Sequence, residues 1–166
     1  MSLLSGAVVS DMIAYNTGDA RRISHALKVY SFAKTIGELE NLDSQAQQTL
    51  ELAAILHDIG IHASEEKYHS SAGNYQELEG PPIARELLKK QELSPHMLER
   101  VCFLIGHHHT YQAVDGIDYQ ILIEADFLVN AYEDSMSPKQ IASVREKVFQ
   151  TKTGIQFLNA MYPSNL

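Results

Sequence analysis

The sequence predicts an all-α, single-domain helical bundle of about six to eight helices. Apolar residues recur at intervals of three and four along most of the 166 residues. Serine, proline and glycine stand at positions typical of helix ends. No segment alternates polar and apolar residues for long enough to predict a sheet. A chain of this length fits one domain around one core, so we assign residues 1–166 to a single domain.

Three helices are expected in the first third of the chain: Leu3 to Tyr15, Asp19 to Ile36, and Ser44 to His57. The first ends at a turn-forming run, and Gly37 is the stop signal for the second. The third has a capping signal at its start, carries an apolar stripe, and stops at Gly60.

The middle of the chain, from Ile61 to about Gly80, is rich in serine, glycine and charge and is expected to form a long loop. Pro81 and Pro82 should open a short helix to about Lys90, because proline suits a first helical turn. The remaining helices are expected from Ser94 to His108, from Tyr119 to Tyr132, from Ser137 onward, and from Gly154 to Tyr162.

Charge and cysteine content narrow the range of partners. The formal net charge of −8 would repel a nucleic-acid polymer or an anionic membrane surface at long range. Small anionic substrates remain compatible with it, because a bound cation inverts the local potential. Cys102 is the only cysteine, which excludes an intrachain disulfide and a thiolate zinc cluster. With only a short apolar start before Arg21, the sequence predicts a cytoplasmic protein.

Four expected helices bring imidazoles or carboxylates to apolar stripes. These residues are His25, then His57 with Asp58, then His107 with His108, and finally Asp126. A carboxylate buried alone is costly, whereas imidazoles and carboxylates can share a divalent cation. Nitrogen and oxygen donors without thiolates suit Fe, Mn, Zn, Co or Ni, in a site with an open position. We therefore expect one or two divalent transition-metal ions.

The order of four short motifs resembles that of the HD-domain superfamily of metal-dependent phosphohydrolases. The motifs are Arg22-Ile23-Ser24-His25, Leu56-His57-Asp58-Ile59-Gly60, Leu104-Ile105-Gly106-His107-His108 and Glu124-Ala125-Asp126-Phe127-Leu128. The resemblance covers residues 19–132, and residues 137–162 would add C-terminal helices.

The resemblance implies that His25, His57, Asp58 and Asp126 ligate the primary ion, and that Asp58 bridges to a second ion where one is present. His107 and His108 match the His-His end that supplies further ligands in two-metal relatives. It also implies catalysis by metal-activated water that attacks a phosphorus ester, with Asp58, His57, His107 and His108 as the catalytic residues.

One departure from the family pattern bears on the second ion. No histidine stands just ahead of Gly80, where two-metal relatives have one. Glu77 is our candidate replacement ligand, with Gln76, Glu79 and His69 left open as alternatives, and one ion is ranked slightly ahead of two. His109 is interpreted either as a helix-terminal cation favoured by the dipole or as a catalytic group.

The expected substrate is a phosphomonoester or phosphodiester of a nucleotide or small metabolite, contacted by Arg22, His62 and Lys67. A non-catalytic metal or nucleotide sensor of the same fold is the alternative function, and an all-α interaction module with structural histidines is a third. A homodimer is also compatible with the sequence through apolar residues near the termini: Leu3, Leu4, Val8, Phe157 and Met161.

Overall fold

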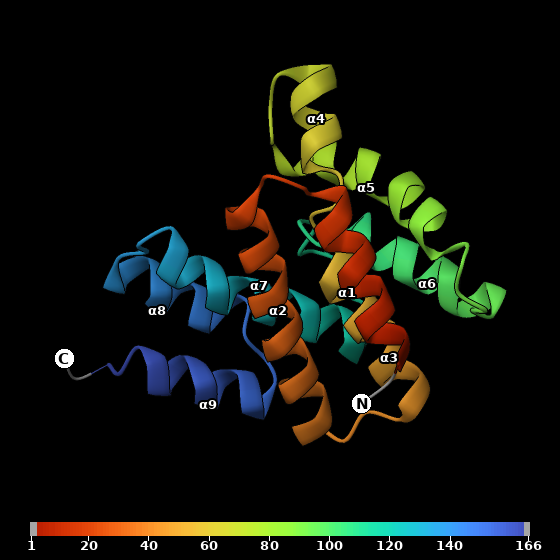
Figure 1. Cartoon of the computed structure of the whole chain (residues 1–166). Helices are drawn as coiled ribbons and strands as arrows, with labels where there is room; N and C mark the ends of the chain where they lie inside the picture. The colour runs from red at the N-terminus through yellow and green to blue at the C-terminus, as the bar shows by residue number, and fades with distance from the viewer. Residues whose placement is uncertain (1–2, 165–166) are drawn as a thin grey trace.

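The computed structural model describes residues 3–164, which form nine α-helices and no strand (Figure 1). The all-α prediction is confirmed, and the expected count of six to eight helices is slightly low. The helices are α1 (Leu3–Tyr15), α2 (Ala20–Leu39), α3 (Ser44–Leu56), α4 (Ile61–Tyr68), α5 (Gly73–Leu88), α6 (Pro95–Ile105), α7 (Ile117–Glu133), α8 (Pro138–Lys147) and α9 (Lys152–Met161).

Side-chain caps determine where five of these helices begin. In each case the residue before the helix accepts a hydrogen bond from a backbone N–H in the first turn, which satisfies a donor that the helix leaves free. Ser137 and Gln140 form a full capping box at α8. The capping residues are Asp19, Asp43, Ser94, Ser137 and Thr151.

Helix α3 lies at the centre of the bundle and contacts α1, α2, α6 and α7. Every residue from Thr49 to Leu56 is buried, so the second half of the helix has no solvated face. A helical segment buried on all sides must be surrounded by other helices. Its C-terminal end therefore delivers His57 and Asp58 into the interior of the protein, beside α2 and α7.

The prediction of a long loop from Ile61 to Gly80 is wrong, because the segment folds into α4 and the first half of α5. Only Ile61 and Ser64 of α4 are buried, so this helix lacks the apolar stripe that would have revealed it. The helix stops at His69, which adopts a left-handed backbone with φ of 53°. Figure 1 shows α4 at one end of the bundle, packed on α5.

Pro81 and Pro82 lie inside α5 and do not open a helix, which corrects the second expectation for this region. Each proline removes a backbone donor and interrupts the helical hydrogen bonding. The helix nevertheless continues, because it packs against α4 and α6 on either side. A Cβ on Gly80 would lie 2.8 Å from Ile105 Cγ2, and this close approach explains the glycine.

Gly37 does not end α2, which runs on to Leu39. Its place in the helix is explained by close packing against α3: a Cβ on Gly37 would meet the side chain of Gln47 and lie 3.1 Å from Leu50 Cδ2. The chain turns instead at Asn41, whose φ is 59°. Gly37 therefore allows α2 to pack closely against α3 and does not end the helix.

The apolar residues near the termini mostly serve the protein's own core. Val8 is buried, and Leu4 and Phe157 pack against the core, whereas Met161 is exposed. The side chain of Leu3 lies outside the described part of the structure. The homodimer stays a prediction. None of the described helices combines the length and apolar character that crossing a membrane requires.

Candidate metal centre

Four side chains, from α2, from α7 and from the two residues after α3, converge at the C-terminal end of α3. His25 comes from α2, Asp126 comes from α7, and His57 and Asp58 directly follow α3. The Nε2 atom of His25 lies 3.2 Å from His57 Nε2, 3.2 Å from Asp58 Oδ2 and 3.2 Å from Asp126 Oδ1. The Nε2 atom of His57 lies 3.3 Å and 3.5 Å from the same two oxygens. The predicted primary ligands are thus brought together.

These separations fit ligands of one transition-metal ion. Nitrogen and oxygen donors about 2.1 Å from an ion lie about 3.0–3.4 Å from one another in octahedral or tetrahedral geometry. The observed separations run from 3.2 to 3.5 Å. His25, His57 and Asp58 are accordingly able to hold an ion as a group, and Asp126 Oδ1 faces both histidine nitrogens of that group.

The two imidazoles present lone pairs to this group. His57 Nδ1 donates to the carbonyl oxygen of Ala54 at 2.7 Å, and His25 Nδ1 donates to Glu133 Oε1 at 2.7 Å. With the Nδ1 proton of each ring committed to an acceptor, Nε2 is the ring nitrogen that can offer a lone pair to a metal ion. Two such nitrogens face each other and two carboxylates, an arrangement that calls for a cation among them.

The electrostatics of the group also call for positive charge. Burial alone would lower the pKa of His25, but hydrogen bonds to Asp126 and Asp58 overcome that effect and raise the pKa to about 10. Burial would likewise raise the pKa of Asp126, yet His25 and His57 hold it well below its usual range. A divalent ion would satisfy this demand without protonating the ligands.

A second donor group uses the other oxygen of Asp58 and two residues that follow α6, His108 and His109. His108 Nδ1 donates to the carbonyl oxygen of Ile105 at 2.8 Å, which leaves Nε2 unprotonated. This Nε2 atom is fully buried, lies 3.3 Å from Asp58 Oδ1 and makes no hydrogen bond. Such orphaned atoms are rare in native proteins. An ion between the two atoms would explain the arrangement.

His109 contributes to the second group through a contact with α5. Its Nε2 atom lies 3.1 Å from Gln76 Oε1. Because Gln76 Nε2 donates to the carbonyl oxygen of Ser71 at 2.6 Å, the amide oxygen is the atom that faces His109. His109 therefore holds its proton on Nε2 and has a free lone pair on Nδ1. Burial, assisted by His108, lowers the pKa of His109 to about 4, so the interpretation as a helix-terminal cation is wrong.

His107 takes part in neither donor group among the described residues. Its Nδ1 atom donates to the carbonyl oxygen of Phe103 at 2.7 Å, and its ring stacks on Phe103 with centroids 4.0 Å apart. The structure thus brings His108 to Asp58 as expected, but pairs it with His109. The side chains of the three consecutive histidines project in different directions from the turn after α6. The sequence pattern does not indicate which of them faces Asp58.

The residues weighed as replacements for the missing histidine have different contacts. Glu77 accepts hydrogen bonds from His109 N at 2.9 Å and Thr110 Oγ1 at 3.0 Å, so it fixes the turn and joins neither group. Glu79 pairs with Lys67, and His69 is exposed. Gln76 is the candidate that contacts the imidazole of a donor-group residue, through the amide oxygen that faces His109 Nε2.

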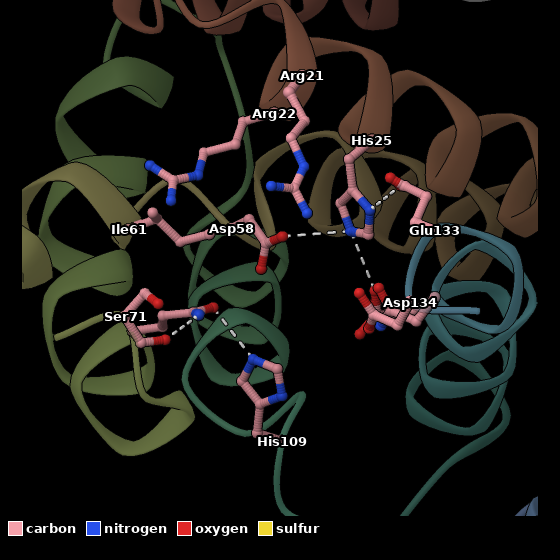
Figure 2. A pocket seen from close by; sticks show the side chains of 12 residues that line it. Arg21, Arg22, His25, Asp58, Ile61, Ser71, His109, Glu133 and Asp134 are labelled. Carbon is pink, nitrogen blue, oxygen red and sulfur yellow. Dashed lines mark hydrogen bonds and ion pairs between the residues drawn. The ribbon is translucent and has the colours of Figure 1, made fainter. Parts of the chain in front are cut away.

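A cleft of about 380 Å³ opens onto Asp58 and Asp126. Figure 2 shows α2 side chains along one wall and the end of α7 along the other. Of the expected substrate contacts, Arg22 lines the cleft, whereas His62 and Lys67 do not. Arg21 also lines it, and we missed this residue because a surface arginine at the start of a helix has no distinguishing pattern.

All three expected substrate contacts already have carboxylate partners. Arg22 is bonded to Glu65, with Nη1 3.1 Å from Oε2. His62 Nε2 lies 2.7 Å from Asp19 Oδ2, and Lys67 Nζ lies 2.8 Å from Glu79 Oε2. The structure therefore supports none of them as a freely available phosphate contact.

Comparison with known proteins agrees with the fold. The family model described as the HD domain matches residues 22–139. No curated protein matches the chain. A crystal structure described as a predicted HD superfamily hydrolase, from an uncultured Thermotogales bacterium, is similar with a TM-score of 0.69 and 23% identity. The match covers 93% of this chain and 83% of the other, and at this identity it shows the shared fold. This protein belongs to the HD-domain family.

Proposed function

We propose that this protein is a metal-dependent phosphohydrolase that acts on a phosphomonoester or phosphodiester of a small metabolite or nucleotide. The observation that carries the proposal is the position of Asp58. Its Oδ2 atom faces His25 and His57, while its Oδ1 atom faces His108. One carboxylate shared by two donor groups is suited to bridging two ions beside a cleft.

The donor sets indicate which residues would hold the ions. His25, His57, Asp58 and Asp126 would hold the first, and Asp58, His108 and His109 the second. Imidazole and carboxylate donors favour Mn, Fe, Co, Ni or Zn. When bound, such ions polarise phosphoryl oxygens and lower the pKa of water.

The chain itself orients the ligands. Glu133 and the carbonyls of Ala54 and Ile105 fix the tautomers of three imidazoles, and such outer contacts strengthen metal binding. The side chains of His57 and His108 have no exposed surface, and their Nδ1 protons are committed to carbonyls. Both residues are therefore suited to act as ligands and unsuited to protonating a leaving group.

The cleft also bears on the substrate. A cavity of about 380 Å³ is at the lower end of the range for small-molecule sites. The net charge of −8 disfavours a nucleic-acid polymer. A small phosphorylated molecule, a nucleotide among others, fits both properties better.

The test is hydrolysis by the metal-loaded protein of p-nitrophenyl phosphate, bis(p-nitrophenyl) phosphate and a panel of nucleotides. Asp58→Asn should lower the metal content and reduce turnover by about a hundredfold or more, because it removes the shared charge. Asp115→Asn is the matched control, since Asp115 pairs with Arg100 on the surface. It should leave both properties unchanged.

Other outcomes would favour the alternatives. Stoichiometric metal without turnover on any phosphoester would overturn the enzyme proposal and favour a metal or nucleotide sensor. Absence of a stoichiometric transition metal, in protein purified without chelators, would favour structural histidines. Anomalous diffraction at the metal edges would identify the element and its ligands in the same crystals.

A further inference from the structure

Arg21 lies in the cleft without a partner. It lines the cavity together with His25 and Asp58, and its side chain is exposed. In Figure 2 the guanidinium of Arg21 reaches from α2 into the space between Arg22 and His25, and no interaction joins it to another residue drawn. Among residues 3–164 the structure gives the side chain of Arg21 no hydrogen bond and no ion pair.

The other cations around this end of the protein are neutralised. Arg22 is bonded to Glu65 and lies 3.4 Å from Asp19. Lys67 pairs with Glu79, and Lys28 Nζ lies 3.9 Å from Glu133 Oε1. To bind an anion, Arg22 would have to break its ion pair with Glu65, whereas Arg21 only exchanges water for the ligand. Of the described arginines that line the cleft, Arg21 is therefore the one that is free to receive an anion.

The position of Arg21 on α2 places it next to the metal centre. It precedes His25 by four residues, so the two side chains project from the same face one helical turn apart. The guanidinium of Arg21 lies beside His25 in the same cavity that Asp58 lines (Figure 2). An anion bound in this cavity near Asp58 is therefore close to a positive charge on α2.

The opposite wall of the cleft has the opposite charge. The end of α7 contributes Glu133 and Asp134, together with the neutral Asn130. These carboxylates repel an anion and favour hydroxyl or amino groups. The cleft is therefore polarised, with its anion-binding side on α2.

We propose that Arg21 binds the phosphoryl group of the substrate with its guanidinium fork, and so directs the phosphorus toward the Asp58 edge of the cleft. Arginine donates two parallel hydrogen bonds to phosphate oxygens, which fixes orientation as well as position. The uncharged part of the substrate then faces Asn130 and Asp134. This inference rests on the proposed phosphohydrolase function and assigns a residue to its substrate binding.

The experiment compares Arg21→Gln and Arg21→Lys with the wild-type protein, all loaded with the same metal. The first readout is binding of inorganic phosphate by isothermal titration calorimetry, and the second is hydrolysis of p-nitrophenyl phosphate. Arg21→Gln should weaken phosphate binding about tenfold to a hundredfold, because it removes a charged pair of hydrogen bonds. Arg21→Lys should fall between, since lysine keeps the charge and loses the fork.

Lys34→Gln is the control, because it removes one positive charge from the same helix outside the cleft, where Lys34 pairs with Glu38. Phosphate affinity equal in Lys34→Gln and wild type but lost in Arg21→Gln, at unchanged metal content, supports the inference. Equal losses in the two variants, or no loss in Arg21→Gln, overturn it while the proposed function stands. A wild-type protein that neither binds phosphate nor hydrolyses any phosphoester overturns the proposed function itself.

Discussion

Gln76 Oε1 accepts a hydrogen bond from His109 Nε2 at 3.1 Å, in a chain that has no histidine just ahead of Gly80. The glutamine is buried and its amide nitrogen is held by Ser71 O, so its oxygen has a fixed direction. Gln76 thus sets the tautomer of the neighbouring His109 imidazole. The second donor group becomes Asp58, His108 and His109.

Gln76→Met should therefore weaken metal binding by the second donor group and leave metal binding by the first group unchanged. Methionine has a similar shape but no carbonyl oxygen, so His109 would lose the acceptor that holds its proton on Nε2. Loss of such an outer contact lowers metal affinity by about tenfold to a hundredfold. The measurement is metal stoichiometry by elemental analysis at limiting free metal. The stoichiometry of Gln76→Met should be closer to one ion per chain, against two for the wild type.

Gln45→Met is the control for this change, because Gln45 is exposed and lies outside the cleft of the metal centre. Its stoichiometry should match that of the wild type. A wild-type protein with a single ion, held by His25, His57 and Asp58, would contradict the two-ion arrangement.

Glu133→Gln should lower the metal affinity of the first donor group, which contains His25. Glu133 Oε1 accepts the Nδ1 proton of His25 at 2.7 Å, and its negative charge increases the basicity of the opposite ring nitrogen. Glutamine keeps an acceptor oxygen but removes that charge, so the metal affinity should fall by about tenfold. Competition with a chromophoric chelator measures the affinity.

Glu146→Gln makes the same charge change at an exposed position on α8. It should have no effect on the chelator competition. Equal affinities in Glu133→Gln and wild type would show that the carboxylate only positions the ring.

Glu124 should make stability depend on pH. This buried carboxylate accepts hydrogen bonds from Thr151 Oγ1 at 2.7 Å and Gln120 Nε2 at 2.6 Å, which tie α7 to the segment before α9. Burial nevertheless raises the pKa of Glu124 above its ordinary value of 4.5. A group with a raised folded-state pKa stabilises the fold below its unfolded pKa, and this contribution is lost as the pH rises through the folded value.

Glu124→Gln removes this titration. The free energy of unfolding of the wild type, relative to the variant, should therefore decrease as the pH rises above 4.5. Urea unfolding of both proteins from about pH 4 to about pH 8 measures the difference. A difference that stays constant, or that grows with pH, would contradict the raised pKa.

Gly60→Ala should destabilise the protein through a backbone contact. A Cβ at this position would lie 2.6 Å from the backbone nitrogen of Gly80 and 2.8 Å from the carbonyl oxygen of Gln76. Neither atom can rotate away, so α5 would have to shift relative to the end of α3. Overpacking of this kind costs about 1–3 kcal/mol, which thermal or urea unfolding would detect.

Gly6→Ala provides the opposite case. Gly6 is in α1 and its Cβ would meet nothing within 4 Å. Alanine at this exposed position should stabilise the protein by about 0.5–1 kcal/mol, because it has the better helix propensity. If both alanine variants behaved alike, the close approach of α5 to Gly60 would not be the cause of the effect.

Several helix boundaries were predictable because local chemistry fixes them. Ser94 and Ser137 cap helices through their own side chains, and the apolar period of the following residues continues each helix. The errors fall where packing opposes the local signal. Pro81 and Pro82 stay inside α5, and Gly37 stays inside α2, because neighbouring helices stabilise these turns from outside the segment.

The sequence by itself determined the all-α fold, because helical periodicity is a local property that specifies which residues lie on buried faces. The order of its motifs, through the resemblance to the HD-domain family, singled out His25, His57, Asp58 and Asp126 as a candidate donor set. Only the tertiary structure decided the pairing of His108 with His109 and the availability of Arg21 in place of Arg22. Both depend on side-chain directions and on carboxylates distant in sequence, such as Glu65, which the linear pattern does not bring together.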